Sequence, residues 1–281
     1  MEEKMKKQAG YAIEIEGLTK TYGKKRGVRG ISFAVEEGDI FGFLGPNGAG
    51  KSTTIRSMLG MLHFSEGQIR LLGMDTKKQQ KEILNQVGYM PSEAFLYPSM
   101  KVKQVISFAA QARKKDCEKE AARLSRILEV DGEKKISELS LGNRKKVSII
   151  CAMQHKPKLL ILDEPTSGLD PLMQEAFFGL LLEYNSQGTT IFLSSHVLSE
   201  VKKYCRHAAI IRDGRLAGTD TVANLSRTNL RRVRIREKGE EKEFVHDGNI
   251  KELLVRLNEM DLEDVLIEEP PLEEVFMHYY E

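Results

Sequence analysis

The chain has 281 residues, and its 43 Lys and Arg against 41 Asp and Glu leave a formal net charge of +2. At about 150 residues per domain, this length predicts one large domain, or a large domain with a small one. The near-balance of charge gives no reason to expect a nucleic-acid-binding protein, which usually carries a net basic face. The three cysteines form no C-x-x-C pair, which argues against a disulfide framework or a cysteine metal cluster and favours buried thiols.

Apolar segments of the chain are short. The run Leu159–Leu162 is flanked by Lys158 and Asp163, whereas a membrane-spanning helix needs about 20 predominantly apolar residues. Residues Met1–Gln8 are largely polar or charged and no apolar core follows them, unlike the pattern of a secretory signal peptide. We therefore expect a soluble protein of the cytoplasm.

The amino-terminal part of the chain has the pattern of β-strands. Between Tyr11 and Leu44, apolar residues alternate with polar ones, which is the period of half-buried strands. Within this part, the mostly apolar run Ile40–Leu44 is typical of a central strand. The strand pattern resumes at Gly67–Leu72.

The middle of the chain alternates helices and strands. Apolar positions at helical spacing predict amphipathic helices at Ser99–Arg113 and Glu118–Leu128. The run Leu159–Leu162 predicts a strand buried on both faces, as in a parallel sheet. Helix, strand and helix are then predicted at Leu172–Tyr184, Thr189–Ser194 and Val197–Tyr204. This alternation predicts an α/β domain.

The composition changes near Arg227. Val233 and Ile235 alternate with arginines, which predicts a strand, and Lys238-Gly239 turns the chain into a second one. A helix, a short strand and a final helix are predicted at Ile250–Met260, Val265–Ile267 and Leu272–Tyr280. We expect residues 227–281 to form a small accessory α+β module. Its basic first strand is interpreted as a solvated edge rather than a binding patch.

A glycine-rich segment follows the predicted central strand and precedes a helical stretch, and it fits G-x-x-x-x-G-K-[ST]. It consists of Gly45, Pro46, Asn47, Gly48, Ala49, Gly50, Lys51, Ser52 and Thr53. Glycines let successive backbone N–H groups face phosphate oxygens, and the helix N-terminus adds partial positive charge. Lys51 can reach the β- and γ-phosphates, and the Ser52 hydroxyl can ligate Mg²⁺. The pattern favours a nucleoside triphosphate site over a structural turn.

The buried strand Leu159–Leu162 leads directly into Asp163 and Glu164. Two acids at a strand end are often only a solvated terminus. Downstream of a phosphate-binding loop, however, they suit phosphoryl transfer: Asp163 would hold Mg²⁺ through water, and Glu164 could polarise the attacking water.

A serine-glycine turn, Leu139–Arg144, precedes another helical stretch. Its Ser140 hydroxyl, its backbone N–H groups and the helix dipole could contact an anion. In isolation such a serine is usually a helix cap. Its place about twenty residues before Asp163 favours a functional role.

These motifs, in this order and together with Tyr22, Ser167–Asp170 and Ser194–His196, resemble the nucleotide-binding subunit of an ATP-binding cassette (ABC) transporter over roughly Tyr11 to Leu225. The resemblance implies an α/β P-loop NTPase core with an N-terminal antiparallel β subdomain and an inserted helical subdomain at about residues 92–156. It places the ATPase domain at residues 1–226.

The resemblance also assigns residues that bind ATP. Gly45–Thr53 corresponds to the Walker A loop, and Tyr22 to the aromatic residue that stacks on adenine, with ordinary packing as its alternative. Ser140 and Gly142 correspond to the signature motif, which contacts ATP bound by a second subunit. Asp170 corresponds to the aspartate of the loop that crosses the dimer interface; alone, it would more often be a helix cap.

Three further residues correspond to those that carry out ATP hydrolysis in this family. Asp163 resembles the Walker B metal aspartate and Glu164 the catalytic base. His196 resembles the switch histidine that senses the γ-phosphate. The cofactors implied are ATP and Mg²⁺.

The family resemblance further implies a head-to-tail dimer that closes over two ATP molecules and drives separate membrane-spanning permease subunits. The protein would then lie on the cytoplasmic face of the cell membrane, and its dimer could be a homodimer or a heterodimer. A monomer should bind ATP but hydrolyse it poorly.

The sequence departs from the family pattern at two places. The usual Gly-Gly-Gln of the signature is Leu141-Gly142-Asn143 here, and leucine at the first of these positions is familiar among ABC-2 exporters. The loop glutamine that normally follows Pro91 is Ser92, with Glu93 next. We interpret Ser92 as peripheral to the chemistry and Tyr89–Tyr97 as mainly a docking edge for the membrane subunit. Burial of Phe95–Tyr97 in the core is the alternative.

The sequence therefore favours the ATPase subunit of an ABC-2 exporter. An importer ATPase with a regulatory tail remains an alternative. So does a soluble ABC protein acting on ribosomes or DNA, although this chain has one phosphate-binding loop and no long heptad run.

Overall fold

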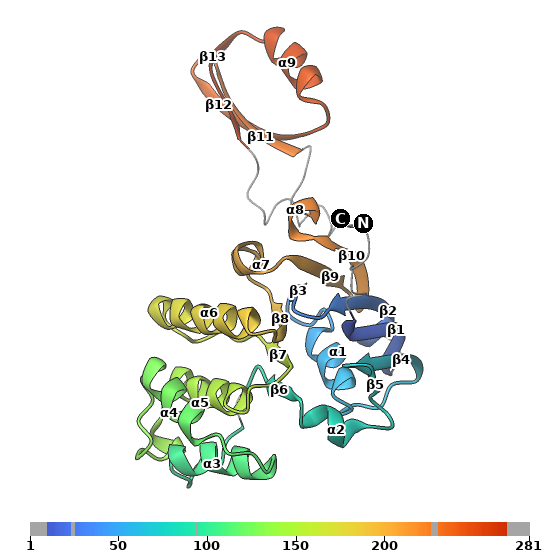
Figure 1. Ribbon diagram of the computed structural model, residues 1–281. Helices are drawn as coiled ribbons and strands as arrows, with labels where there is room; N and C mark the ends of the chain where they lie inside the picture. Colours follow the sequence, from blue (N-terminus) through green and yellow to red (C-terminus); the bar gives the residue numbers. More distant parts are fainter. Residues whose placement is uncertain (1–9, 24–25, 94, 226–229, 269–281) are drawn as a thin grey trace, which may run out of the picture. The chain divides into compact units, whose positions relative to one another are not determined.

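The computed structural model describes residues 10–23, 26–93, 95–225 and 230–268. Its contacts divide the chain into two compact units, with the division between Thr219 and Asp220. Each unit is described separately below (Figure 1). None of the helices within the described ranges combines the length and the apolar character needed to cross a membrane.

The first unit contains two sheets. An antiparallel sheet has the order β2-β1-β4-β5, with bounds Arg26–Glu36, Tyr11–Tyr22, Glu66–Leu71 and Met74–Asp75. The second sheet has the order β10-β9-β3-β8-β7-β6, and all the strand pairs from β9 to β6 are parallel. Its bounds are Arg215–Thr221, His207–Arg212, Ile40–Leu44, Thr190–Ser195, Leu159–Asp163 and Val87–Met90.

Helices cover the parallel sheet on both faces. In Figure 1, α1 and the antiparallel sheet lie on one side of the strands, and α5, α6 and α7 lie on the other. The helices of this unit are α1 Lys51–Met58, α2 Gln80–Leu84, α3 Val102–Ala112, α4 Glu118–Ile127, the 3₁₀ helix Ile136–Glu138, α5 Leu141–Met153, α6 Pro171–Ser186 and α7 Leu198–Tyr204. The predicted α/β P-loop fold with an antiparallel β subdomain is confirmed.

An aromatic core joins the two sheets. Phe33 of β2 stacks on Phe41 of β3 and Phe192 of β8, with ring centroids 5.6 and 5.9 Å apart. Rings at this separation gain stacking energy beyond the burial of their surface. The apolar side chains of the alternating strand β2 contact those of the apolar strands β3 and β8 here. These contacts hold the antiparallel sheet against the parallel one.

Parallel pairing brings three loops to one edge of the sheet. Gly42 of β3 pairs with Leu193 of β8 and with Ala208 of β9, and Leu162 of β7 also pairs with Leu193. The carboxyl ends of β3, β7 and β8 therefore coincide, which is where ligands bind in open α/β sheets.

The second unit contains a three-stranded antiparallel sheet of order β12-β11-β13 and the helix α9. The bounds are α8 Val222–Leu225, β11 Leu230–Glu237, β12 Glu240–Asp247, α9 Ile250–Asn258 and β13 Leu262–Glu268. Val233 and Ile235 of β11 pack with Leu253 and Leu257 of α9 in a small core. The predicted final helix, Leu272–Tyr280, lies outside the described residues.

The interpretation of the basic strand as a solvated edge is wrong, because β11 is the central strand of this sheet. Its arginines lie opposite acidic residues of β12: Arg234 forms an ion pair with Glu243 at 3.0 Å, and Arg236 forms one with Glu241 at 2.8 Å. Cross-strand pairs of opposite charge favour pairing. The charge that suggested an edge is compensated by the neighbouring strand.

Burial of His155, which follows α5, should make the stability of the protein depend on pH. Its Nε2 lies 3.3 Å from the Val87 carbonyl oxygen, and burial lowers the pKa of His155 to about 3. The unfolded chain therefore takes up a proton that the folded chain does not, and stability falls as pH drops below about 6.5. Between pH 7 and pH 5 this residue should cost about 2 kcal/mol of unfolding free energy.

Urea unfolding at pH 7 and at pH 5 measures this loss. We expect the unfolding free energy of His155→Gln to fall less between the two pH values than that of the parent, by about the same amount. The exposed His63, changed to Gln, is the control and should retain the parent's pH dependence. Equal pH dependence in His155→Gln and the parent would contradict the burial argument.

Candidate nucleotide site

The phosphate-binding loop connects β3 to α1 at the carboxyl edge of the sheet. A Cβ on Gly45 would lie 2.4 Å from the Ile211 carbonyl oxygen, and one on Gly50 would lie 2.6 Å from a Val28 methyl group. Gly50 also has a φ of +113°, which favours glycine. These contacts exclude larger residues at both positions.

The loop lines a hollow of about 240 Å³. Residues of the loop and of two other segments border it: Asn47, Gly48, Gly50, Lys51, Ser52, Thr53, Ser92 and Glu164. Lys51 is 5% exposed, and its Nζ lies 2.6 Å from the Gly45 carbonyl oxygen and 3.0 Å from Glu164 Oε1. The predicted association of the loop with Glu164 is thus present in the structure.

Asp163 ends β7 and is completely buried. Its Oδ1 accepts a hydrogen bond of 2.6 Å from the Ser194 hydroxyl. Its Oδ2 has no hydrogen-bond partner among the described residues. A buried carboxylate oxygen without a partner is costly unless a cation or a water approaches it, so this residue fits the predicted Mg²⁺ site.

Glu164 has a left-handed backbone, with φ +50°. Its side chain lies between two cationic or polar groups: Oε1 is 3.0 Å from Lys51 Nζ, and Oε2 is 2.6 Å from His196 Nδ1. His196 follows β8 and is half-exposed. The structure therefore brings together Lys51, Glu164 and His196, as the sequence predicted.

Lys145 of α5 is a neighbour of this group that the sequence reading did not single out. It is 4% exposed, and its Nζ lies 2.5 Å from both the Glu164 carbonyl oxygen and the Ser167 hydroxyl. Burial lowers the pKa of Lys145, whereas the carboxylates of Glu164, Asp163 and Glu200 act in the opposite direction. A lysine near the polar start of a helix is expected, from the sequence pattern, to be exposed to solvent. Only the three-dimensional structure reveals this contact.

The other predicted residues lie outside the phosphate hollow. Ser140 is exposed and caps α5, accepting a bond of 3.3 Å from Asn143 N; Asp170 is exposed and caps α6, accepting one of 3.0 Å from Met173 N. Both are thus helix caps, and both keep exposed side chains. Tyr22 is 45% exposed at the end of β1, so its ring lies outside the buried core.

Gly142 faces the segment that follows Glu164. A Cβ at this position would lie 2.6 Å from the Gly168 carbonyl oxygen. The first turn of α5 therefore packs closely against the loop before α6, which excludes a larger residue at Gly142.

Ser92 borders the phosphate hollow, whereas Glu93 is exposed. Serine is shorter than the glutamine usual in the family by roughly 2–3 Å of side chain, and a bridging water can replace a direct contact at little cost. We expect Ser92→Ala to lower ATP turnover by less than about tenfold.

Steady-state ATPase assays of the isolated subunit measure this effect, with Glu93→Ala as the control for a neighbouring substitution. If Ser92→Ala loses hydrolysis as completely as Glu164→Gln does, Ser92 contacts the reacting groups directly and is not peripheral.

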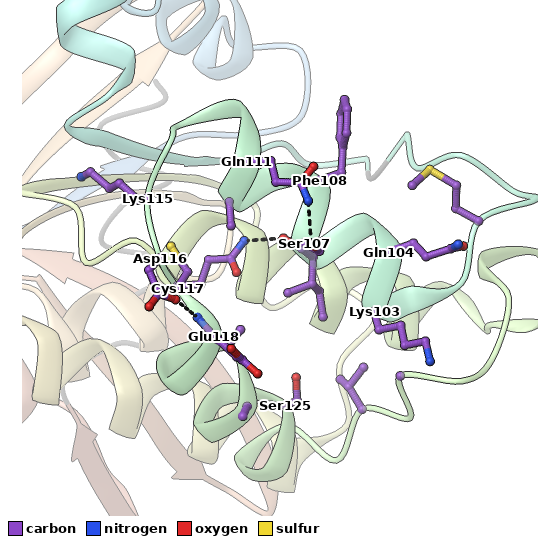
Figure 2. A pocket seen from close by; sticks show the side chains of 18 residues that line it. Lys103, Gln104, Ser107, Phe108, Gln111, Lys115, Asp116, Cys117, Glu118 and Ser125 are labelled. Carbon is purple, nitrogen blue, oxygen red and sulfur yellow. Dashed lines mark hydrogen bonds between the residues drawn. The ribbon is translucent and has the colours of Figure 1, made fainter.

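A separate cavity of about 830 Å³ lies between α3 and α4, away from the phosphate loop (Figure 2). Phe108 of α3 borders it and is exposed, and Tyr97 contacts Phe108 edge to face at 6.3 Å. Phe95 and Tyr97 are 87% and 62% exposed. The alternative that these two aromatic residues are buried in the core is therefore wrong.

Comparison with known proteins agrees with this geometry. A family model described as ABC transporter matches residues 28–167. The chain is 39% identical over 208 residues to the uncharacterized ABC transporter ATP-binding protein YhaQ of Bacillus subtilis, covering 72% of this chain and 69% of that protein. It is 33% identical to the bacitracin transport ATP-binding protein BcrA of Bacillus licheniformis, covering 95% of this chain and 85% of BcrA.

A third relative, the probable multidrug ABC transporter ATP-binding protein YbhF of Escherichia coli, is 35% identical over 218 residues, but the match covers only 38% of that longer protein.

Solved structures show the same fold. An ATP-binding subunit of an ABC transporter covers 96% of this chain with a TM-score of 0.77 and 24% identity. The structure of cbiO1 from Clostridium perfringens, part of the transporter complex cbiONQ, covers 76% of this chain and 90% of its own, with a TM-score of 0.65 and 27% identity. The chain therefore belongs to the ABC transporter family, as an ATP-binding and ATP-hydrolysing subunit.

Proposed function

We propose that this ATPase subunit powers the export of an antimicrobial compound through separate membrane-spanning permease subunits. The observation that carries the proposal is the similarity to the bacitracin transport protein BcrA, which extends over 95% of this chain and includes its second unit. A relative named for linearmycin resistance, 34% identical over 218 residues, supports the same class of cargo.

The nucleotide would be held mainly by the phosphate-binding loop. Backbone N–H groups between Asn47 and Thr53 and the N-terminus of α1 would bind its phosphates, with Lys51 at the β- and γ-phosphates. Tyr22 would stack on adenine, because its ring is exposed at the end of β1. Mg²⁺ would be held by Ser52 and Asp163, and when bound it neutralises charge on the phosphate oxygens.

Hydrolysis would depend on Glu164 and His196. The Glu164 carboxylate would accept a proton from the attacking water as the water's oxygen bonds to the γ-phosphorus and ADP leaves. His196 contacts that carboxylate through Nδ1 at 2.6 Å, so it would orient Glu164 and contact the γ-phosphate.

Two subunits would close head to tail over two ATP molecules, as a homodimer or with a related partner. Ser140, Gly142 and Asp170 lie outside the phosphate hollow of their own chain, which supports a role at the site of the second subunit. The helix start at Ser140 offers a hydroxyl and backbone N–H groups to an anion.

The domain assignment belongs to this proposal. Residues 1–226 would form the ATPase domain, with a helical subdomain at about 92–156, and residues 227–281 would form the accessory domain. Packing of α3 and α4 against α5 supports the helical subdomain. The subunit would lie on the cytoplasmic face of the cell membrane.

The exposed aromatic residues Phe95, Tyr97 and Phe108 are proposed as the docking surface for the permease. We expect Phe95→Ala to spare ATP turnover of the isolated subunit and to weaken its co-purification with the permease about tenfold, because a buried aromatic anchor contributes 1 kcal/mol or more to an interface. An exposed aromatic residue elsewhere, Tyr11, changed to Ala, is the control.

The export proposal is tested by expressing subunit and permease together in a bacitracin-sensitive bacterium. The minimal inhibitory concentration of bacitracin-like peptides should rise, and the rise should disappear with the Glu164→Gln subunit. Unchanged sensitivity to such compounds, with the ATPase active and the complex assembled, would contradict this class of cargo.

A further inference from the structure

The backbone of Glu164 is held from both sides. Its N–H donates to the Ser194 carbonyl and hydroxyl oxygens, each at 3.2 Å. Its carbonyl oxygen accepts from Lys145 Nζ at 2.5 Å and from the Ser167 hydroxyl at 3.3 Å. A left-handed backbone is unfavourable for a residue with a side chain and persists where surrounding bonds impose it.

Lys145 is the member of this set that comes from another element. Ser167 belongs to the same loop as Glu164, and Ser194 lies on the neighbouring strand β8, but Lys145 lies on α5, one turn after Gly142. Its ammonium group is buried and is bound by two oxygen acceptors. Removing one partner of a buried polar contact leaves the other partner unsatisfied.

The first turn of α5 thus touches the Glu164–Gly168 loop twice. Lys145 bonds its beginning at Glu164, and Gly142 packs against its end at Gly168, where a Cβ would lie 2.6 Å from the carbonyl oxygen. Two contacts one turn apart fix both the position and the rotation of the helix start relative to the loop.

We infer that Lys145 is a positioning residue for ATP hydrolysis, which holds the backbone of Glu164 and couples the carboxylate to the signature turn that begins α5. The inference rests on the proposed roles of Glu164 and of Ser140–Gly142. A displacement of α5 on contact with ATP of the second subunit then shifts the Glu164 carboxylate in its own site. The two ATP sites communicate through this lysine.

The test separates turnover from binding. Lys145→Met keeps a long unbranched side chain and removes the donor group. Because a small misplacement of a reacting group lowers rate more than affinity, kcat should fall about 10- to 100-fold while KM for ATP and the affinity for a fluorescent ATP analogue stay within about twofold. Lys145→Arg, which keeps N–H donors, should recover part of the lost kcat.

Two further variants exclude a merely structural effect. Lys146→Met is the matched control, because Lys146 is also buried in α5, at 8% exposure, and the bonds described for Glu164 come from other residues. Its kcat should stay within about twofold of the parent's. If Lys145→Met fails to fold, Ser167→Ala removes the second donor to the same carbonyl at an exposed position and should lower kcat with unchanged KM.

The inference is overturned if kcat of Lys145→Met stays near the parent value, if ATP affinity falls in proportion to kcat, or if Lys146→Met loses as much turnover. Glu164→Gln in the same assay distinguishes the failures. Should it retain parental turnover, the proposed role of Glu164 is wrong; should it lose turnover while Lys145→Met keeps the parental kcat, only the role of Lys145 is wrong.

Discussion

Glu164→Gln should lower ATP turnover by about 100- to 10,000-fold, the range contributed by general base catalysis, and leave ATP bound. The amide has the shape of the carboxylate but cannot accept a proton at neutral pH. Lys51 and His196 contact the two carboxylate oxygens at 3.0 and 2.6 Å, so the substitution also removes the charge between them. Bound ATP that is not hydrolysed should favour the closed dimer, measured by size exclusion with Mg-ATP.

Glu93→Gln provides the control, because Glu93 is an exposed glutamate near the same site. It should keep parental turnover and remain in the parental oligomeric state. A Glu164→Gln subunit that stays monomeric with Mg-ATP, or hydrolyses ATP at the parental rate, would contradict the assignment of the catalytic base.

Asp163→Asn should have opposite effects on stability and on activity. The completely buried carboxylate has an oxygen without a described hydrogen-bond partner. Replacing this carboxylate by an amide should raise the unfolding free energy without nucleotide by about 1 kcal/mol, because burying a carboxylate costs more than burying a neutral amide. Turnover should fall by about a hundredfold or more, because the site loses a charged contact to the Mg²⁺ that stabilises the transition state.

Steady-state ATPase assays measure the fall in turnover, and thermal unfolding without nucleotide, with ATP and EDTA, and with Mg-ATP measures stability and its dependence on Mg²⁺. In the variant, ATP alone should stabilise the protein as in the parent, and the extra stabilisation by Mg²⁺ should disappear, because only ligand bound to the folded state contributes. Asp39→Asn is the control: Asp39 is also buried, but it pairs with His207 at 2.7 Å at the amino end of β3. Unaltered Mg²⁺ stabilisation in Asp163→Asn would remove Asp163 from the metal site.

The sequence was sufficient where local pattern and burial agree. Ile40–Leu44 and Leu159–Asp163 are strands with every residue buried, and their continuous apolar runs predicted this. The phosphate loop was recognisable from its motif, and the structure explains two of its glycines: a Cβ on Gly45 would lie 2.4 Å from a backbone oxygen, and Gly50 has a φ of +113°. The strand His207–Arg212, which pairs with β3, was not predicted, since a four-residue apolar run there fits strand and helix alike.

Other features depend on residues far apart in the chain. The arginines of β11 suggested an edge, yet their acidic partners lie on β12, so position in the sheet could not be read from one strand. The contact of Lys145 with Glu164 joins residues 19 positions apart through the packing of α5. No local pattern distinguishes such a lysine from a solvated one.

The strand order also determines when during synthesis the site can form. β3, which carries the phosphate loop, lies between β8 and β9, so its pairing partners are made about 150 residues after it. Gly45 N itself donates to the Ser195 carbonyl oxygen at 3.3 Å. Contacts this distant in sequence form late, because the chain between them must first be ordered. A nascent chain that has completed the phosphate loop but not β8 therefore lacks the strand that pairs with β3. The ATP site can become functional only after nearly all of the first unit has been synthesised.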